Sequence, residues 1–207
     1  KNSNTEGSIR ENFILDITPG INADLFVSSF NGGIDQVNIR TLSVVPYLSL
    51  AEGQNTGIPN LAATRLLCDR RGNLWTGGED FLGLVSANEK KYRALDLPRG
   101  LQFKGTYVTF FRELNDSTIA VGINEIGILF YNSQSFRLNG MLELDAAPRV
   151  GQLPNNGLVQ VNDTVLYFSA GPYLVKGSYR NGKWQTAKKA LLNTPGQQTI
   201  NCLVKDP

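Results

Sequence analysis

The sequence contains no histidine, and this absence removes several classes of function at once. Without histidine there is no Ser-His-Asp triad, no Cys-His pair, no HExxH metalloprotease site and almost no conventional zinc site. Only two cysteines are present, Cys68 and Cys202, and their separation matches no metal-ligand spacing. Each lies in a short apolar run, so we interpret both as buried free thiols rather than as a bridge. We therefore expect no metal and no cofactor.

Charge is also scarce, since only 18% of the residues are charged against about 25% in an average soluble protein. The 20 basic and 18 acidic side chains nearly cancel, and the basic residues form no block longer than a pair. A nucleic-acid surface needs enough clustered Lys and Arg to neutralise several phosphates. No apolar run approaches the ~20 residues of a membrane span. We expect neither nucleic-acid binding nor membrane contact by this segment.

A repeat of nearly constant length organises the chain. A short apolar strand ends in a small residue at Ser28, Gly77, Gly122 and Ser169, and these positions are separated by 49, 45 and 47 residues. The next apolar strand begins a few residues later in every case. The small residue and the start of the following strand therefore recur with the same period, which is the sequence signature of a repeat architecture.

Each period has room for four strands. In the second repeat we predict strands at 65–69, 74–78, 84–90 and 92–97, with a turn at 70–73. Further hairpin turns are predicted at Asn115-Asp116 and Asn162-Asp163, because Asn and Asp favour turn conformations. Both sites also match the glycosylation acceptor pattern, which we interpret as turn chemistry. No segment shows a helical stripe longer than about two turns.

The fold class predicted is all-β, a β-propeller of about four four-stranded blades. A period of ~40–50 residues holding four antiparallel strands is typical of propeller blades. Residues 1–207 then form one partial propeller domain, with blades at about 8–50, 64–97, 106–144 and 157–192. Residues 199–207 are expected to be the first strand of a fifth blade. We therefore expect an excerpt of a larger propeller, with apolar surface that further blades or a second copy would cover.

The second repeat carries the most specific motif, built on Asp69, Gly72, Asn73, Trp75 and Gly77. It resembles the D-x-x-G-N-L-W-x-G-T core of the two-component regulator propeller repeat. The other repeats depart from this core, with Phe, Ala and Tyr in place of the Trp. WD40 is excluded as an alternative, because its Gly-His signature needs histidine.

The resemblance implies a function in signalling. It implies an extracytoplasmic, ligand-sensing region of a bacterial hybrid histidine kinase of the Bacteroidetes type, periplasmic and part of an inner-membrane protein, in many relatives sensing saccharides. Trp75 would wedge against a neighbouring blade. The partners expected are an oligosaccharide or other small polar ligand, the remaining blades of the parent chain, and a second copy in a homodimer.

Blade topology points to one face for the ligand. The turns between second and third strands emerge beside the long links at 51–63, 98–106 and 145–157, and long loops on a rigid scaffold often carry binding residues. The candidate ligand-binding residues on this face are Asn31, Glu79, Asp80, Asn124, Glu125, Arg99 and Arg149. Amides and carboxylates can bond sugar hydroxyls, and Arg can bind a carboxylate through two hydrogen bonds.

Trp184 could also stack on a sugar, whereas Trp75 is expected in the core. We expect no catalytic residues. The alternative functions are a protein-binding scaffold and a propeller glycosidase or lyase, for which Asp80 and Glu125 would be the carboxylate pair.

Overall fold

The computed structural model describes residues 7–30, 33–48, 63–89, 91–101, 105–143, 158–170, 173–181, 183–190 and 203. The chain divides into two compact units, residues 1–108 and 109–207, and each is considered by itself. The described residues form strands and turns only, with no helix among them. Accordingly, the described part of the chain contains no helix that is long and apolar enough to cross a membrane.

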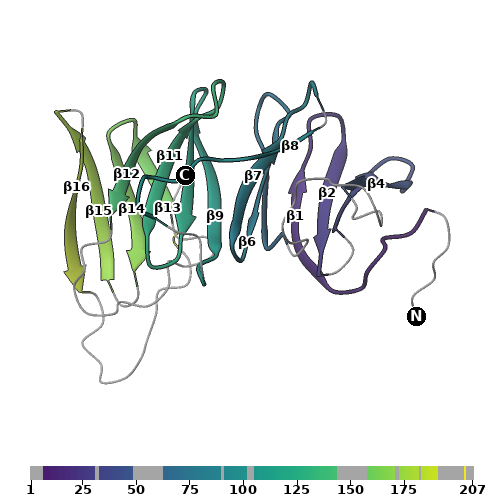
Figure 1. Ribbon diagram of the computed structural model, residues 1–207, viewed down its shortest axis with the longest axis horizontal. Coiled ribbons are helices and arrows are strands. Elements are labelled where there is room, and N and C mark those ends of the chain that lie inside the picture. Colours follow the sequence, from purple (N-terminus) through teal and green to yellow (C-terminus); the bar gives the residue numbers. More distant parts are fainter. Residues whose placement is uncertain are drawn as a thin grey trace, which may run out of the picture. The chain divides into compact units, whose positions relative to one another are not determined.

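The first unit contains two four-stranded antiparallel sheets, here called blades 1 and 2 (Figure 1). Blade 1 consists of β1 (Ile14–Pro19), β2 (Asp24–Ser29), β3 (Gly33–Asn38) and β4 (Val44–Leu48). Blade 2 consists of β5 (Arg65–Cys68), β6 (Leu74–Gly78), β7 (Phe81–Val85) and β8 (Tyr92–Ala94). In both blades each strand pairs with the next one along the chain.

The second unit contains blades 3 and 4, which have the same simple order. Blade 3 consists of β9 (Val108–Asn115), β10 (Thr118–Ile123), β11 (Gly127–Asn132) and β12 (Leu138–Glu143). Blade 4 consists of β13 (Leu158–Asn162), β14 (Val165–Ala170), β15 (Tyr173–Arg180) and β16 (Lys183–Ala190). The predicted all-β class and four-stranded blades are confirmed.

The core of each unit lies between its two sheets. In the first unit Phe26 and Ile34 of blade 1 pack with Leu66, Leu74 and other buried residues of blade 2. In the second unit a single buried cluster combines residues of blade 3, such as Phe110 and Ile128, with residues of blade 4. Strands β6 and β7 are buried at every position. The middle strands therefore read as continuous apolar runs, because both of their faces are covered.

Asp69 organises the turn between β5 and β6. Its Oδ1 accepts hydrogen bonds from the backbone N–H groups of Arg71 (3.0 Å) and Asn73 (2.9 Å). Its Oδ2 accepts from Asn73 Nδ2 (3.0 Å) and from Trp75 Nε1 (2.8 Å). Asn73 Oδ1 in turn accepts from the N–H of Ala87 (3.2 Å). The motif of the second repeat is thus a closed hydrogen-bond network around one buried carboxylate.

Glycine is required in this motif for two different reasons. Gly72 has φ +83°, a left-handed conformation that side chains disfavour, and a Cβ there would lie 2.6 Å from Ile21 Cδ1. A Cβ on Gly77 would lie 2.4 Å from Val108 Cγ2, and one on Gly122 would lie 2.3 Å from Phe110 Cε1. In these two repeats, the small residue one position before the end of the second strand is therefore set by close packing.

The predicted turns at Asn115 and Asn162 are Asx turns. Asn115 Oδ1 accepts from the N–H and the hydroxyl of Ser117, each at 3.0 Å. Asn162 Oδ1 accepts from the N–H (3.0 Å) and the hydroxyl (3.1 Å) of Thr164. Hydrogen bonds within these two turns explain the sequences that match the glycosylation acceptor pattern.

Three details differ from the sequence expectation. The third strand of blade 2 is β7, not the predicted 84–90, because residues 79–80 form a two-residue hairpin loop and a turn follows Val85. Cys68 is half-buried rather than buried. The proposed fifth-blade strand at 199–207 and Cys202 lie outside the described residues, except for Leu203.

Arg10 fastens the segment before β1 to blade 1. Its Nε donates to Asp35 Oδ1 at 2.6 Å, and its backbone N–H donates to Asp35 Oδ2 at 3.2 Å. One terminal nitrogen also donates to the carbonyls of Ile34 and Leu48, each at 3.0 Å. Asp35 is only 1% exposed, so Arg10 supplies the partner that a buried carboxylate requires.

Large apolar side chains are exposed on and beside blade 1. They are Phe13, Ile14, Ile17, Ile21, Phe30, Ile39, Leu42 and Val45.

Trp75→Ala should lower the free energy of unfolding by about 3–5 kcal/mol, because it empties a fully buried site and removes the indole that bonds Asp69. Val161→Ala, at a position 47% exposed, should change it by less than about 0.5 kcal/mol. Denaturant titration followed by far-ultraviolet circular dichroism measures both. A Trp75→Ala protein as stable as the Val161→Ala control would show that Trp75 is not a core residue.

Arg10→Ala should lower the free energy of unfolding by about 3 kcal/mol, because it leaves Asp35 buried without its cationic partner. Adding Asp35→Asn to that variant should recover part of the loss, since a neutral amide is less costly to bury. A double-mutant cycle in urea gives the coupling energy. A coupling energy near zero would contradict the role assigned to this ion pair.

Candidate functional site

Glu79 and Asp80 form the hairpin loop between β6 and β7. Asp80 has φ 61°, a left-handed conformation that Asp tolerates better than most residues. Its backbone N–H donates to the carbonyl of Thr106 (3.1 Å), and its Oδ1 accepts from the N–H of Gly105 (2.7 Å). Glu79 is exposed and forms a β-bridge with Tyr107. The Asp80 carboxylate therefore binds Gly105, while backbone bonds of Glu79 and Asp80 hold Thr106 and Tyr107 against this turn.

Asn124 and Glu125 occupy the corresponding turn of blade 3. Glu125 is exposed with φ 62°, and thus repeats the backbone conformation of Asp80. Asn124 is 6% exposed, and its Oδ1 has no hydrogen-bond partner among the described residues. The two turns belong to different units. Each pair of residues therefore shares one turn of its own unit.

The other predicted residues are placed less fully. Arg99 is exposed in a turn closed by a hydrogen bond from the N–H of Leu101 to the carbonyl of Pro98 (3.1 Å). Asn31 and Arg149 lie outside the described residues.

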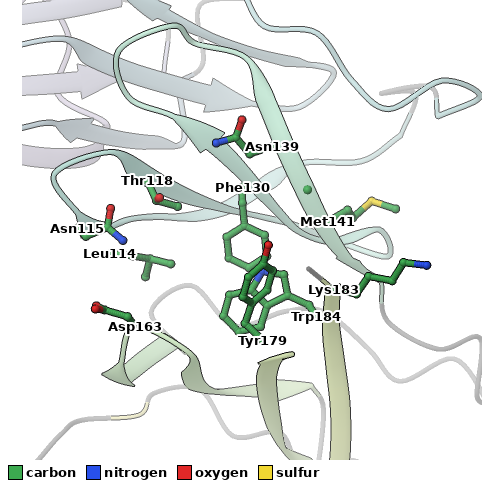
Figure 2. A pocket seen from close by; sticks show the side chains of 11 residues that line it. Leu114, Asn115, Thr118, Phe130, Asn139, Met141, Asp163, Tyr179, Lys183 and Trp184 are labelled. Carbon is green, nitrogen blue, oxygen red and sulfur yellow. The ribbon is translucent and has the colours of Figure 1, made fainter. Parts of the chain in front are cut away.

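A pocket of about 460 Å³ opens between blades 3 and 4 of the second unit (Figure 2). Its volume is within the range of small-molecule sites, about 300–1,000 Å³. The residues that line it are Leu114, Asn115, Thr118, Phe130, Asn139, Gly140, Met141, Asp163, Tyr179, Lys183 and Trp184. None of the five described residues proposed from the sequence as ligand-binding, which are Glu79, Asp80, Asn124, Glu125 and Arg99, is among them.

Three aromatic rings form the centre of this pocket. Phe130 of β11 stacks on Trp184 of β16, with ring centroids 4.8 Å apart and planes at 14°. Tyr179 of β15 lies against Trp184 at 5.3 Å and 54°. The hairpin explains this placement, because Tyr179 and Trp184 are cross-strand partners next to the turn at Asn181, whose φ is 50°. Cross-strand partners share one face of a sheet.

Polar groups surround the rings. Asn115 uses its Oδ1 within its own turn, which leaves its amide nitrogen as a donor at the pocket edge. The side chains of Asn139, Asp163 and Lys183 make no hydrogen bond or ion pair with any described residue. The pocket therefore offers donors and acceptors that the fold itself does not use.

Burial rather than catalytic pairing explains the shifted pKa values. Burial raises the pKa of Asp16, although N–H groups of Leu66 and Ile17 and the charge of Arg65 oppose the shift. Burial also raises the pKa of Tyr47, with a smaller contribution from Cys68, and raises the pKa of Tyr92 to about 12. All three groups belong to the first unit, where Asp16 Oδ2 also accepts the N–H of Leu66 (2.8 Å) and so joins β1 to β5. No group of three potential metal ligands occurs in the described part of the chain.

Solved structures with this architecture include extracellular domains of bacterial signalling proteins. One is the extracellular domain assigned to the hybrid two component system BT3049 of B. thetaiotaomicron, with TM-score 0.61 and 13% identity over 91% of this chain and 23% of that one. Another is the extracellular domain assigned to the one component system BT4673 of the same organism, with TM-score 0.64 and 18% identity over 88% of this chain and 23% of that one.

The chain has the fold of these extracellular domains. It spans about a quarter of their length. A chain of a mitotic checkpoint complex is also similar, with TM-score 0.61 and 13% identity over 86% of this chain and 52% of that one. No protein-family model and no curated protein sequence matches the chain. The two bacterial matches share the fold that the resemblance to sensor propellers implies, while the checkpoint match shows that one fold serves different functions.

Of the pocket residues, Trp184 was the one predicted from the sequence to stack on a sugar, because it follows the Asn181-Gly182 turn. Phe130 and Tyr179 were not singled out, because nothing in the sequence shows that β11 and β16 approach each other.

Asp80→Ala should loosen residues 105–107, because Gly105 loses the acceptor for its N–H. Hydrogen exchange at the Gly105 amide should become several-fold faster, while Asp80→Asn, which keeps an acceptor oxygen, should retain the parent rate. Equal exchange in both variants would show that the Asp80 carboxylate does not hold the link.

Proposed function

We propose that this chain is part of an extracytoplasmic ligand-sensing propeller in a bacterial two-component sensor, and that it recognises an oligosaccharide or another small polar ligand. The observation that carries the proposal is the shared fold with extracellular domains of signalling systems. The D-x-x-G-N-L-W motif supports it independently, because the residues of that motif form the Asp69 network.

Two regions could hold such a ligand. One is the turn at the end of the second strand of a blade, either Glu79-Asp80 in the first unit or Asn124-Glu125 in the second, where Glu79 and Glu125 are exposed. The other is the pocket between blades 3 and 4, which combines aromatic rings with unused polar groups. A rigid β scaffold favours recognition at either place, since little ordering is needed on binding.

The rival functions have weaker support. A glycosidase needs two carboxylates at a fixed separation across the sugar, and Asp80 already accepts a hydrogen bond from Gly105 in a hairpin loop. A protein scaffold would use the exposed apolar side chains of blade 1. We propose instead that a further blade of the same propeller covers those side chains, because a blade is apolar on both faces.

The chain should bind at least one saccharide from a panel of plant, host and microbial glycans, measured by isothermal titration calorimetry, and should leave that saccharide intact. Amino acids and nucleotides at the same concentration serve as controls. Release of a cleaved product would indicate an enzyme instead. If every saccharide fails to bind while a protein partner does, the scaffold function replaces the sensor.

A further inference from the structure

We propose that the pocket between blades 3 and 4 is the saccharide site, with a sugar ring lying against Trp184 and Tyr179. This inference rests on the proposed function. It assigns ligand binding to residues outside the long-link face, which is the face predicted from the sequence to carry Glu79, Asp80, Asn124 and Glu125. Both blades contribute to the pocket, with Asn115, Phe130 and Asn139 from blade 3 and Asp163, Tyr179 and Trp184 from blade 4.

The aromatic cluster provides a surface for the apolar face of a sugar. Trp184 is half-buried and has one side covered by Phe130, while Tyr179 is 44% exposed. One face of a pyranose ring is made of C–H groups, which pack favourably against exposed aromatic surface. Exposed aromatic rings in a concave site, held in place by a buried Phe130, are therefore suited to a sugar ring.

The indole nitrogen supplies a donor that the fold leaves unused. A buried Trp N–H usually has a hydrogen-bond partner within the protein. Trp75 obeys this rule through Asp69, whereas no described residue accepts a hydrogen bond from Trp184 Nε1. A ligand hydroxyl in the pocket would supply the missing acceptor.

The remaining polar groups favour a neutral polyhydroxyl ligand. Asn115 and Asn139 offer amide groups, and Asp163 and Lys183 carry one charge of each sign. An anion would need several cations, and Lys183 is the one cation among the described residues that line the pocket. Hydroxyl groups both donate and accept, so they can use the amides, the carboxylate and the ammonium together.

The pocket has room beside Gly140. A Cβ added to Gly140 would have no atom within 4 Å, although this residue lies next to Asn139 and Met141 in the pocket wall. Gly140 pairs with Phe130 across β11 and β12, so both residues lie on the face that forms the pocket. The Cβ of a larger side chain at 140 therefore displaces no neighbouring atom, and the rest of that side chain would compete with a ligand for the space of the pocket.

Tryptophan fluorescence tests the site directly, because the chain has only two tryptophans. Trp75 is 0% exposed, so acrylamide quenches mainly the half-buried Trp184. A saccharide found by calorimetry should protect Trp184 from acrylamide. Trp184→Phe should keep the ring contact, lose the N–H donor, and weaken binding between about twofold and tenfold. Gly140→Phe should abolish binding with an unchanged melting curve.

The matched control is the Glu79→Ala/Glu125→Ala double variant, which alters the long-link face and leaves the pocket intact. It should bind like the parent. Loss of binding in this control, with Trp184→Phe and Gly140→Phe unaffected, would overturn the pocket and leave the sensor function standing. Binding of an amino acid or nucleotide in the pocket would overturn the saccharide assignment. If no saccharide binds the chain without substitutions, the proposed function fails and this inference fails with it.

Discussion

A blade of this protein cannot be stable alone, because its sheet is apolar on both faces. The middle strands of blades 2 and 3 are buried at nearly every position, as β6, β7 and β10 show. Burial of apolar surface is worth roughly 25 cal/mol per Å², and within each unit the two sheets cover one face of each other. Close packing of successive sheets is therefore the constraint on which the other features depend.

That constraint explains where small and polar residues occur. An added Cβ would collide with Val108 at Gly77, inside the first unit, and with Phe110 at Gly122, inside the second. Asp16 crosses from β1 to the N–H of Leu66 on β5, and Asp35 is buried only because Arg10 reaches it. Buried carboxylates are kept where backbone N–H groups or a guanidinium satisfy them, as Asp69 also shows.

The same packing creates the pocket. Blades 3 and 4 share a buried cluster, but near the hairpin of β15 and β16 the sheets contact each other through Phe130 and Trp184 and leave space beside Gly140. A ligand placed there would contact both blades at once. Binding would thus stabilise the contact between two repeats, which is a physical route from recognition to a change in the rest of a propeller.

Much of the architecture was determined by the sequence itself. The period, the four strands of each repeat and the turns at Asn115 and Asn162 depend on local preferences, namely strand patterning, glycine conformation and Asx bonding, which neighbouring residues decide. The Asp69 motif is local too, since Asp69, Asn73 and Trp75 lie within one hairpin.

Tertiary structure decided the contacts between residues distant in sequence. Arg10 meets Asp35, Asp80 meets Gly105, and Phe130 meets Trp184 only after separate strands have packed together. No periodic pattern in the sequence predicts these long-range contacts. The sequence could therefore suggest Trp184 as a stacking residue, but its partners and the pocket around it depend on how blade 3 faces blade 4, which is fixed by side-chain packing rather than by any local pattern.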